Sequence, residues 1–205
     1  MRLSILIPSL MSREERRKNL LDNLKKQINS TQESVLNEGT TIIYTFTGDE
    51  AEIILAVDNK ELTTGAKRNL LLEKAKGDYV SFVDCDDEVS VSYFELFKKH
   101  SLRLPDCVSP CGWMTTDGNK RIDWELSKDF QDKTIKNTGR AAFYQRKANH
   151  LCFIKRELAL MAKFPNISNG EDKEFSERIN RLLKTESRIF DQVYHYKYST
   201  HSKEY

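Results

Sequence analysis

Three short apolar runs alternate with amphipathic segments over the first hundred residues, and this pattern constrains the fold more than any other feature. Leu3 to Ile7, Glu52 to Val57 and Tyr79 to Val83 have the length and composition of buried strands. Amphipathic segments at residues 13–28 and 65–76 separate them. A strand–helix–strand order of this kind predicts an α/β fold with a mostly parallel sheet and right-handed crossovers.

Local signals predict where the helices begin and end. Ser12 with Glu15, and Ser92 with Glu95, have the spacing of N-terminal capping boxes, so we expect a helix to begin after each serine. Gly77 follows the second amphipathic segment and is expected to stop that helix.

The second half of the chain, residues 101–205, shows weaker patterns and is expected to be irregular. Cys107 to Met114 is predicted to be a strand, and Asp117-Gly118-Asn119 a turn. An apolar stripe over residues 172–185 predicts a helix, and alternating tyrosines at 194–198 predict a strand.

Size and composition exclude several classes of protein. The chain has 205 residues, 39% hydrophobic and 31% charged, which suits one globular domain. A net charge of +2 gives no strong field toward nucleic acid or membranes. The apolar runs are too short to span a bilayer and the N-terminus lacks a secretory signal, so we expect a cytoplasmic protein without stable membrane insertion. The four cysteines match no zinc spacing and are expected to be free thiols.

An acidic cluster directly after the third apolar run is the clearest sign of chemistry. Asp84, Asp86, Asp87 and Glu88 fall within five positions. Like charges this close repel one another, so a cation would stabilise them, and carboxylate oxygens suit Mg²⁺ or Mn²⁺. The alternative is a solvated acidic loop before a helix. We favour the metal site, because ligands of open parallel sheets bind beyond the carboxyl ends of the strands.

Polar residues also follow the other two apolar runs. Ser9 comes after the first run, and Asp58 and Asn59 after the second, so all are expected at the same edge of the sheet. Lys67 and Arg68 begin the next helix. They either face a phosphate or lie on a solvated helix face.

Taken in order, these motifs resemble glycosyltransferase family 2, whose members have the Rossmann-like GT-A fold. The resemblance rests on Leu3–Pro8, Ile53–Asn59, Gly65–Asn69, Gly77–Asp87 and, more thinly, Gly170–Asp172. It implies a single domain over residues 1–205, with a nucleotide-sugar-binding half (1–100) and an irregular acceptor-binding half (101–205). The implied activity is inverting transfer of a sugar from a nucleotide-sugar donor to an acceptor hydroxyl, with Mn²⁺ or Mg²⁺ as cofactor.

The resemblance also implies roles for individual residues. Asp86 matches the metal-binding carboxylate of the family's DxD motif, and Asp84 matches its partner, which faces the ribose or the metal. Asn59 stands where many members carry a second acid, which leaves the nucleotide base open. The implied donor-binding residues are Ser9, Asp58, Asn59, Lys67, Arg68 and Asp84.

Asp172 matches the general base that removes the acceptor proton, and Glu171 would contact the acceptor. Without the resemblance, Asp172 is equally a favourable acid in the first turn of a helix capped by Ser168 or Asn169.

His195 and His201 are candidates for a further metal ligand, since many GT-A enzymes take one from a late histidine. A lone histidine is more often a hydrogen-bonded structural residue. His150 is a candidate for the acceptor pocket. Trp113 and Trp124 either stack on a sugar or base, or pack in the core.

The acceptor has two alternatives. Residues 118–160 carry ten Lys or Arg against five Asp or Glu, a local excess that would favour a phosphate backbone. The Asp58-Asn59 and Gly65–Asn69 patterns resemble forms found in phages as well as bacteria, and some phages glycosylate their own DNA. We therefore predict hydroxymethylated pyrimidine in double-stranded DNA as the acceptor, in the host cytoplasm. The alternative acceptor is a bacterial surface polysaccharide or another glycan.

Two other classes of protein are alternatives to a glycosyltransferase. A nucleotidyltransferase would carry a glycine-rich phosphate loop after the first strand, where Ser9 to Arg13 contains no glycine. A non-catalytic nucleotide-sugar-binding module would not need Asp172 in addition to the acidic cluster.

Overall fold

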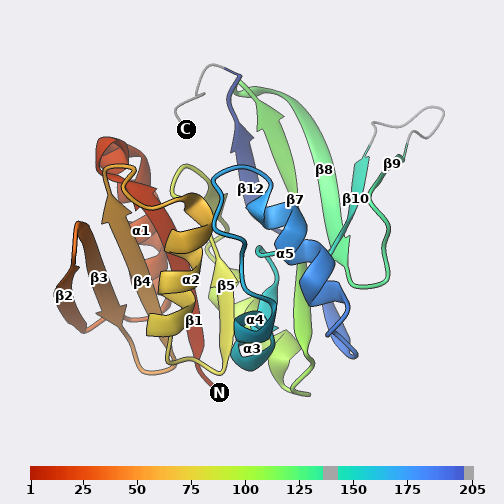
Figure 1. Cartoon of the computed structure of the whole chain (residues 1–205). Helices are drawn as coiled ribbons and strands as arrows, with labels where there is room; N and C mark the ends of the chain where they lie inside the picture. The colour runs from red at the N-terminus through yellow and green to blue at the C-terminus, as the bar shows by residue number, and fades with distance from the viewer. Residues whose placement is uncertain (136–142, 201–205) are drawn as a thin grey trace.

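One mixed sheet organises residues 1–135 and 143–200, which are the residues that the computed structural model describes (Figure 1). Its order is β2-β3-β4-β1-β5-β11-β7-β8-β10-β9, with β12 beside β7 and β6 beside β12. The strands are β1 (Leu3–Leu10), β2 (Gln32–Glu38), β3 (Thr41–Thr47), β4 (Ala51–Asp58), β5 (Tyr79–Phe82), β6 (Glu88–Val89), β7 (Cys107–Thr116), β8 (Asn119–Ser127), β9 (Lys133–Ile135), β10 (Phe143–Lys147), β11 (Phe153–Lys155) and β12 (Glu186–Tyr198). The helices are η1 (Met11–Arg13), α1 (Glu14–Gln27), α2 (Thr64–Lys74), α3 (Tyr93–Ser101), α4 (Arg156–Ala162) and α5 (Glu171–Asn180).

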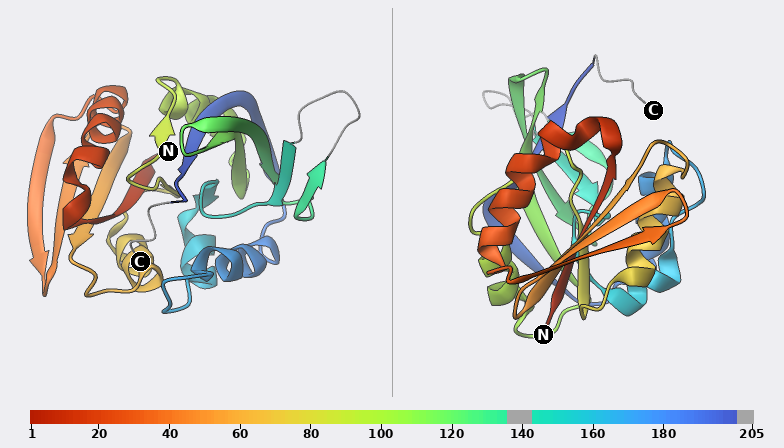
Figure 2. Two further views of the ribbon diagram at one scale, coloured as in Figure 1. Left: turned by 90° about the horizontal axis from the view of Figure 1, so that it is seen from above. Right: turned by 90° about the vertical axis from the view of Figure 1, so that its left-hand side faces the viewer.

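The predicted parallel centre of the sheet is confirmed. β1 lies between β4 and β5 and runs parallel to both. Every residue of β4 is buried, as a central strand covered on both faces requires. Helices α1 and α3 cover one face, and α2, α4 and α5 cover the other (Figure 2). An antiparallel hairpin of β2 and β3 extends the sheet beyond β4.

Both predicted capping boxes are wrong. Ser12 lies inside η1, and the N-cap residue of α1 is Arg13, without a side-chain hydrogen bond. Ser92 does occupy the N-cap position of α3, but its hydroxyl caps nothing. The amide of Phe94 donates instead to Gln27 Oε1 at 2.9 Å. The side chain of Gln27, from α1, therefore caps the first turn of α3 in place of Ser92.

Gly77 is required for a different reason from the one predicted. Helix α2 ends at Lys74, and the backbone of Gly77 is not left-handed. A Cβ at this position would lie 2.6 Å from the backbone nitrogen of Ser4, and the Gly77 amide donates to Ser4 Oγ at 2.8 Å. The residue permits close approach to β1 rather than a helix stop.

The second half of the chain is regular, so the prediction of an irregular half is wrong. β7 pairs antiparallel with β8 across the predicted turn, and parallel with β12. β11 joins these strands to the centre of the sheet by pairing with β5 and β7. Helix α5 ends at Asn180, five residues before the predicted end at Thr185, because the chain then turns into β12.

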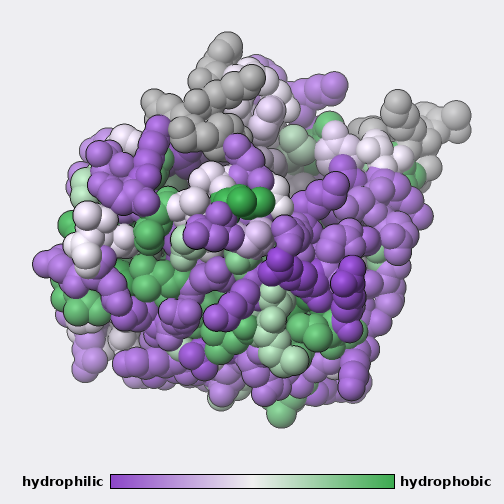
Figure 3. Space-filling model, viewed as in Figure 1, coloured by the Kyte–Doolittle hydropathy of each residue, from purple (hydrophilic) through white to green (hydrophobic). Residues whose placement is uncertain are grey.

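Two further findings concern the cysteines and the helices. All four cysteines are free. No helix of the described chain is long and apolar enough to cross a membrane. On the face shown in Figure 3, hydrophilic side chains predominate and separate the apolar ones into patches.

Candidate active site

An open cleft of about 880 Å³ lies at the carboxyl ends of β1 and β5. The loops after these strands form one wall, and the start of α5 and strands of the second half form the other. Seven of the residues predicted from the sequence line it: Ser9, Lys67, Arg68, Asp84, Asp86, Glu171 and Asp172. The fold therefore brings the acidic cluster and the first turn of α5 to one cavity.

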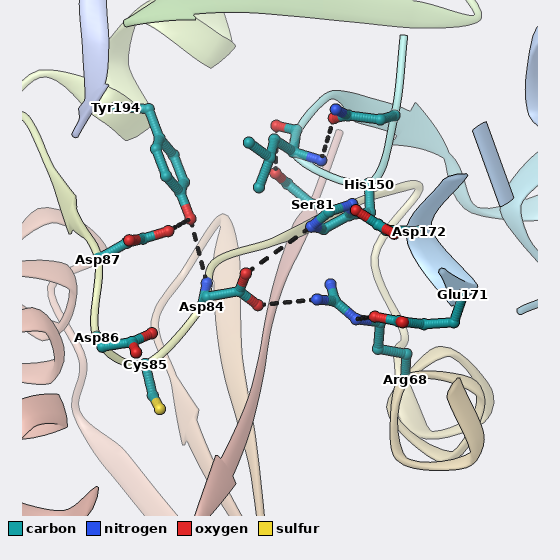
Figure 4. A network of polar contacts seen from close by, with 12 residues as sticks. Arg68, Ser81, Asp84, Cys85, Asp86, Asp87, His150, Glu171, Asp172 and Tyr194 are labelled. Atoms are coloured by element: carbon teal, nitrogen blue, oxygen red, sulfur yellow. Dashed lines mark hydrogen bonds and ion pairs between the residues drawn. The ribbon is translucent and has the colours of Figure 1, made fainter. Parts of the chain in front are cut away.

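Asp84 is held as an anion in this cleft (Figure 4). Arg68 Nη2 donates to its Oδ1 at 3.0 Å, and His150 Nε2 lies 4.0 Å from its Oδ2. Burial by itself would raise the pKa of Asp84, but the charge of Arg68, followed by His150, lowers the pKa well below its usual range. The acid is therefore ionised throughout the neutral range.

Asp87 has a structural role in the same loop. Tyr194 donates its hydroxyl proton to Oδ2 at 2.7 Å, and the amide of Lys197 donates to Oδ1 at 2.8 Å. The Tyr194 hydroxyl also accepts the Asp84 amide at 3.2 Å. Burial, and then the charge of Asp84, raises the pKa of Asp87 well above its ordinary value. Asp87 and Tyr194 thus tie β12 to the acidic loop.

Asp86 is the member of the cluster best placed for a metal. Its side chain is 26% exposed to the cleft, and Arg13 Nη1 lies 3.3 Å from Oδ2. Among the described residues, no three or more metal-binding side chains converge. Mg²⁺ is commonly held by one or two carboxylates with substrate phosphates and water. Asp86, with Asp84 beside it, fits that arrangement and does not fit a metal cage made by the protein alone.

Glu171 and Asp172 begin α5. The N-cap residue of this helix is Gly170, whose backbone is left-handed at φ 82° and which has no side chain to cap the helix. The prediction of Ser168 or Asn169 as the cap is therefore wrong. Glycine tolerates this conformation, which turns the chain so that both acids line the cleft.

The two acids of α5 differ in environment. Glu171 is buried with its Oε1 3.6 Å from Arg68 Nε, and burial raises its pKa. Asp172 is exposed, and its Oδ1 accepts the amide of Lys173 at 2.8 Å. Glu171 therefore supports Arg68, while Asp172 presents a carboxylate to the cleft.

Arg68 joins the two walls of the site. It is 4% exposed and pairs with Asp84 on one side and Glu171 on the other. Its guanidinium also lies 5.3 and 5.6 Å from the ring centroids of Phe82 and Phe164. Nε and Nη1 have no hydrogen-bond partner among the described residues, which leaves donors for a ligand.

Asp58 and Asn59, at the end of β4, do not line the cleft themselves. Asp58 is fully buried, pairs with Lys67, and accepts two amides of the loop that follows at 3.2 and 3.1 Å. Lys67 also donates to the carbonyl oxygen of Ser9 at 2.8 Å. Asn59 is exposed and does not line the cleft. These residues fix the loops around the site.

The structure places His195 outside the cleft lining, away from the proposed metal carboxylates. Its ring stacks on Trp113 with centroids 4.8 Å apart, Nε2 lies 2.9 Å from Thr115 Oγ1, and Nδ1 lies 3.2 Å from Glu88 Oε2. Residue 195 points away from the cleft because side chains alternate along β12, and Tyr194 points inward. His201 lies outside the described residues.

Three residues of the site were missed or left undecided by sequence reasoning. Arg13 contacts Asp86 from η1, and Tyr194 reaches the acidic loop across 110 positions. No local pattern marks either residue, because only the folded sheet brings them near the loop. Trp124 lines the cleft and packs edge-on against Tyr194 at 5.9 Å, whereas Trp113 does not line it.

A mixed sheet with helices on both faces and an acidic loop at the carboxyl edge of its parallel strands is consistent with the GT-A class of fold. The family model described as glycosyl transferase family 2 matches residues 4–161, and the chain belongs to that family.

Similar proteins agree with this assignment. EpsH of Bacillus subtilis (strain 168), which carries the name of a glycosyltransferase, is 26% identical over 143 residues. That match covers 65% of this chain and 41% of EpsH. Two crystal structures of S. aureus TarS 1–349 have the same fold. The complex with UDP-GlcNAc has a TM-score of 0.65 at 16% identity, covering 96% of this chain and 58% of TarS 1–349. The complex with UDP has a TM-score of 0.64 at 17% identity, with 96% and 60% covered. The chain thus spans less than two thirds of each of these relatives.

Proposed function

We propose that this chain transfers a sugar from a nucleotide-sugar donor to an acceptor hydroxyl, with inversion at the anomeric carbon. The observation that carries the proposal is the convergence of the acidic loop, Arg68 and Asp172 on one cleft (Figure 4). Residues 1–100 supply most of the donor side and residues 101–205 most of the acceptor side within one domain.

The donor side suits a diphosphate. The guanidinium of Arg68 is buried and permanently charged, and it has N–H groups without a partner among the described residues. The planar arrangement of these donors matches the oxygens of a phosphate. Ser9 and Lys67 line the same side of the cleft, where the nucleotide is expected. TarS, a structural relative, has been solved with UDP-GlcNAc and with UDP, which supports a nucleotide sugar as the donor class.

A divalent cation fits this donor side. Asp86, with Asp84 beside it, would hold Mn²⁺ or Mg²⁺ together with the donor's phosphates. When bound, the ion supplies Lewis-acid stabilisation of the diphosphate leaving group.

Asp172 acts as the general base. The acceptor oxygen attacks the anomeric carbon while the bond from that carbon to the diphosphate oxygen breaks, through an oxocarbenium-like transition state. Asp172, exposed on the cleft, takes the proton of the attacking hydroxyl. Glu171 keeps Arg68 at the diphosphate by its ion pair.

For the acceptor, we favour a glycan hydroxyl over hydroxymethylated DNA. The prediction of DNA depended on the positive charge of residues 118–160, and four described cations of that segment pair with carboxylates. These pairs are Arg121–Asp123, Lys128–Asp129, Lys147–Glu177 and Lys155–Asp106. Paired cations release fewer counterions from a phosphate backbone, so they contribute less to DNA affinity. Hydroxymethylated DNA is kept as the alternative acceptor.

A donor screen tests the function. UDP-, GDP- and dTDP-sugars are offered with Mn²⁺ or Mg²⁺, and binding and slow hydrolysis are measured. We expect one nucleotide sugar to be bound and hydrolysed with a requirement for the metal. No binding to any nucleotide sugar would contradict the proposal. Release of pyrophosphate from a nucleoside triphosphate in the presence of a sugar phosphate would favour a nucleotidyltransferase. Binding without hydrolysis or transfer would favour a non-catalytic module.

Radiolabelled donor then distinguishes the acceptors. It is offered with hydroxymethylcytosine or hydroxymethyluracil DNA, unmodified DNA, and lipid-linked or free glycans. Label in the glycans alone is expected. Label in hydroxymethylated DNA, with DNA binding that weakens steeply with salt, would reverse the choice of acceptor.

A further inference from the structure

His150 lines the cleft, and its hydrogen bonding is incomplete within the described part of the chain. The residue is 6% exposed, yet neither ring nitrogen has a hydrogen-bond partner there. Nε2 lies 4.0 Å from Asp84 Oδ2, which is longer than a hydrogen bond. A buried polar group without a partner costs free energy. Inside a ligand cleft, such a group points to a partner that the ligand supplies.

The ring of His150 is held firmly in place. Phe82 and Phe164 pack against it edge-on, with centroids 6.3 and 6.5 Å away, and offer it no polar atom. Its backbone is fastened to β5, because the amide of Phe82 donates to the His150 carbonyl oxygen at 3.0 Å and Ser81 Oγ donates to the Leu151 carbonyl oxygen at 3.1 Å. The ring therefore cannot easily turn to find another partner in the protein.

The position of the ring indicates which part of a ligand it meets. Asp84 of the acidic loop lies on one side of the ring, and the side chain of Asp172 also lies near it (Figure 4). In the proposed reaction, the diphosphate lies at the acidic loop and the acceptor hydroxyl at Asp172. The transferred sugar must lie between them, which is where His150 is found.

We propose that His150 binds a hydroxyl group of the transferred sugar and thereby takes part in the selection of the donor sugar. A neutral imidazole has one donor and one acceptor, and so does each sugar hydroxyl. The inference depends on the function proposed above, and it assigns to His150 the sugar rather than the nucleotide.

Calorimetric titration of His150→Phe with UDP-GlcNAc and with UDP tests this assignment. Phenylalanine keeps an aromatic ring and removes both nitrogens. We expect UDP-GlcNAc to bind about tenfold more weakly than to the wild-type chain, and UDP to bind within about twofold, since only the sugar loses a hydrogen bond. If the donor screen selects another nucleotide sugar, that nucleotide sugar and its nucleoside diphosphate are used instead of UDP-GlcNAc and UDP.

Two controls keep the result interpretable. His100→Phe alters a histidine of α3 that lies 3.0 Å from Ser187 Oγ and does not line the cleft, so it should bind both ligands like the wild type. His150→Gln keeps a donor and an acceptor and should retain more sugar affinity than His150→Phe. The melting temperature of His150→Phe should stay within a few degrees of the wild type, because within the described residues only the 4.0 Å contact with Asp84 is lost.

Equal weakening of UDP-GlcNAc and UDP would overturn the assignment, and so would unchanged affinity of His150→Phe for UDP-GlcNAc. A wild-type chain that binds no nucleotide sugar in the screen would instead refute the proposed function, and this inference with it.

Discussion

The proposed donor half and the proposed acceptor half of the cleft are built in different ways. β1, β4 and β5 form short parallel units, and buried side chains of α2 hold acids at their carboxyl edge: Lys67 pairs with Asp58 and Arg68 with Asp84. The acceptor half pairs strands distant in sequence, and its key carboxylate, Asp172, is exposed. The difference indicates a donor site formed before binding and an acceptor site left open to solvent.

The largest effect is expected from Asp86→Ala. Removal of this carboxylate should abolish transfer and the metal dependence of donor binding, while the melting temperature stays near that of the wild type, because the side chain is partly exposed. Transfer rates and donor titrations with and without chelator check this. Full activity of the variant would contradict the metal assignment on the donor side.

A large loss of stability is expected from Lys67→Met. The side chains of Lys67 and Asp58 are 5% and 0% exposed, so the substitution leaves a buried carboxylate without its cation. Breaking a buried pair in this way costs about 3–5 kcal/mol in the free energy of unfolding. Urea denaturation measures the loss.

Lys74→Met is the matched control on the same helix. Lys74 pairs with Glu38 at the surface, with side chains 32% and 43% exposed, so its loss should cost less than about 1 kcal/mol. Similar costs for the two variants would contradict the view that the donor half is held by buried charge pairs.

The contrast between the halves also explains what the sequence predicted. Glu52 to Val57 and Tyr79 to Val83 are apolar runs whose neighbours in the sheet are close in sequence, so local patterns were sufficient. β12 pairs with β7, beginning at Glu186 opposite Cys107, and these residues are far apart in the sequence. No local pattern predicts such a pairing. The second half therefore looked irregular.

The same reasoning applies to the site. The position of Asp84, Asp86 and Asp172 at the cleft could be predicted, because each residue lies beside a recognisable strand end or helix start. Tyr194 could not, since its hydrogen bond to Asp87 crosses 107 positions. The two capping boxes were predicted wrongly for different reasons. Gln27 caps α3 in place of Ser92, and Ser12 lies inside η1 rather than before α1.

The smallest effect is expected from Asp106→Asn, which probes the acceptor half. Burial opposes ionisation of Asp106, but Lys155 and the amides of Lys184 and Thr185 lower its pKa to about 2. Because the ordinary pKa in an unfolded chain is about 3.9, this carboxylate stabilises the fold above that pH and loses the contribution as the pH falls toward 2. The variant should melt a few degrees below the wild type at pH 7, and the difference should shrink between pH 4 and pH 2. A difference independent of pH would show that charge is not the cause.

One cleft is proposed to join the donor site to a general base at Asp172. The substitution Asp172→Asn tests whether this carboxylate is the base. The amide keeps the size of the side chain and removes its basicity. Donor affinity and single-turnover transfer are measured on the same preparation, with the donor and acceptor found in the screens. We expect transfer to slow by about 10²–10⁴-fold while the donor dissociation constant stays within about twofold. Loss of donor affinity with transfer of the bound donor unchanged would contradict the account and assign Asp172 to the donor side or to the fold.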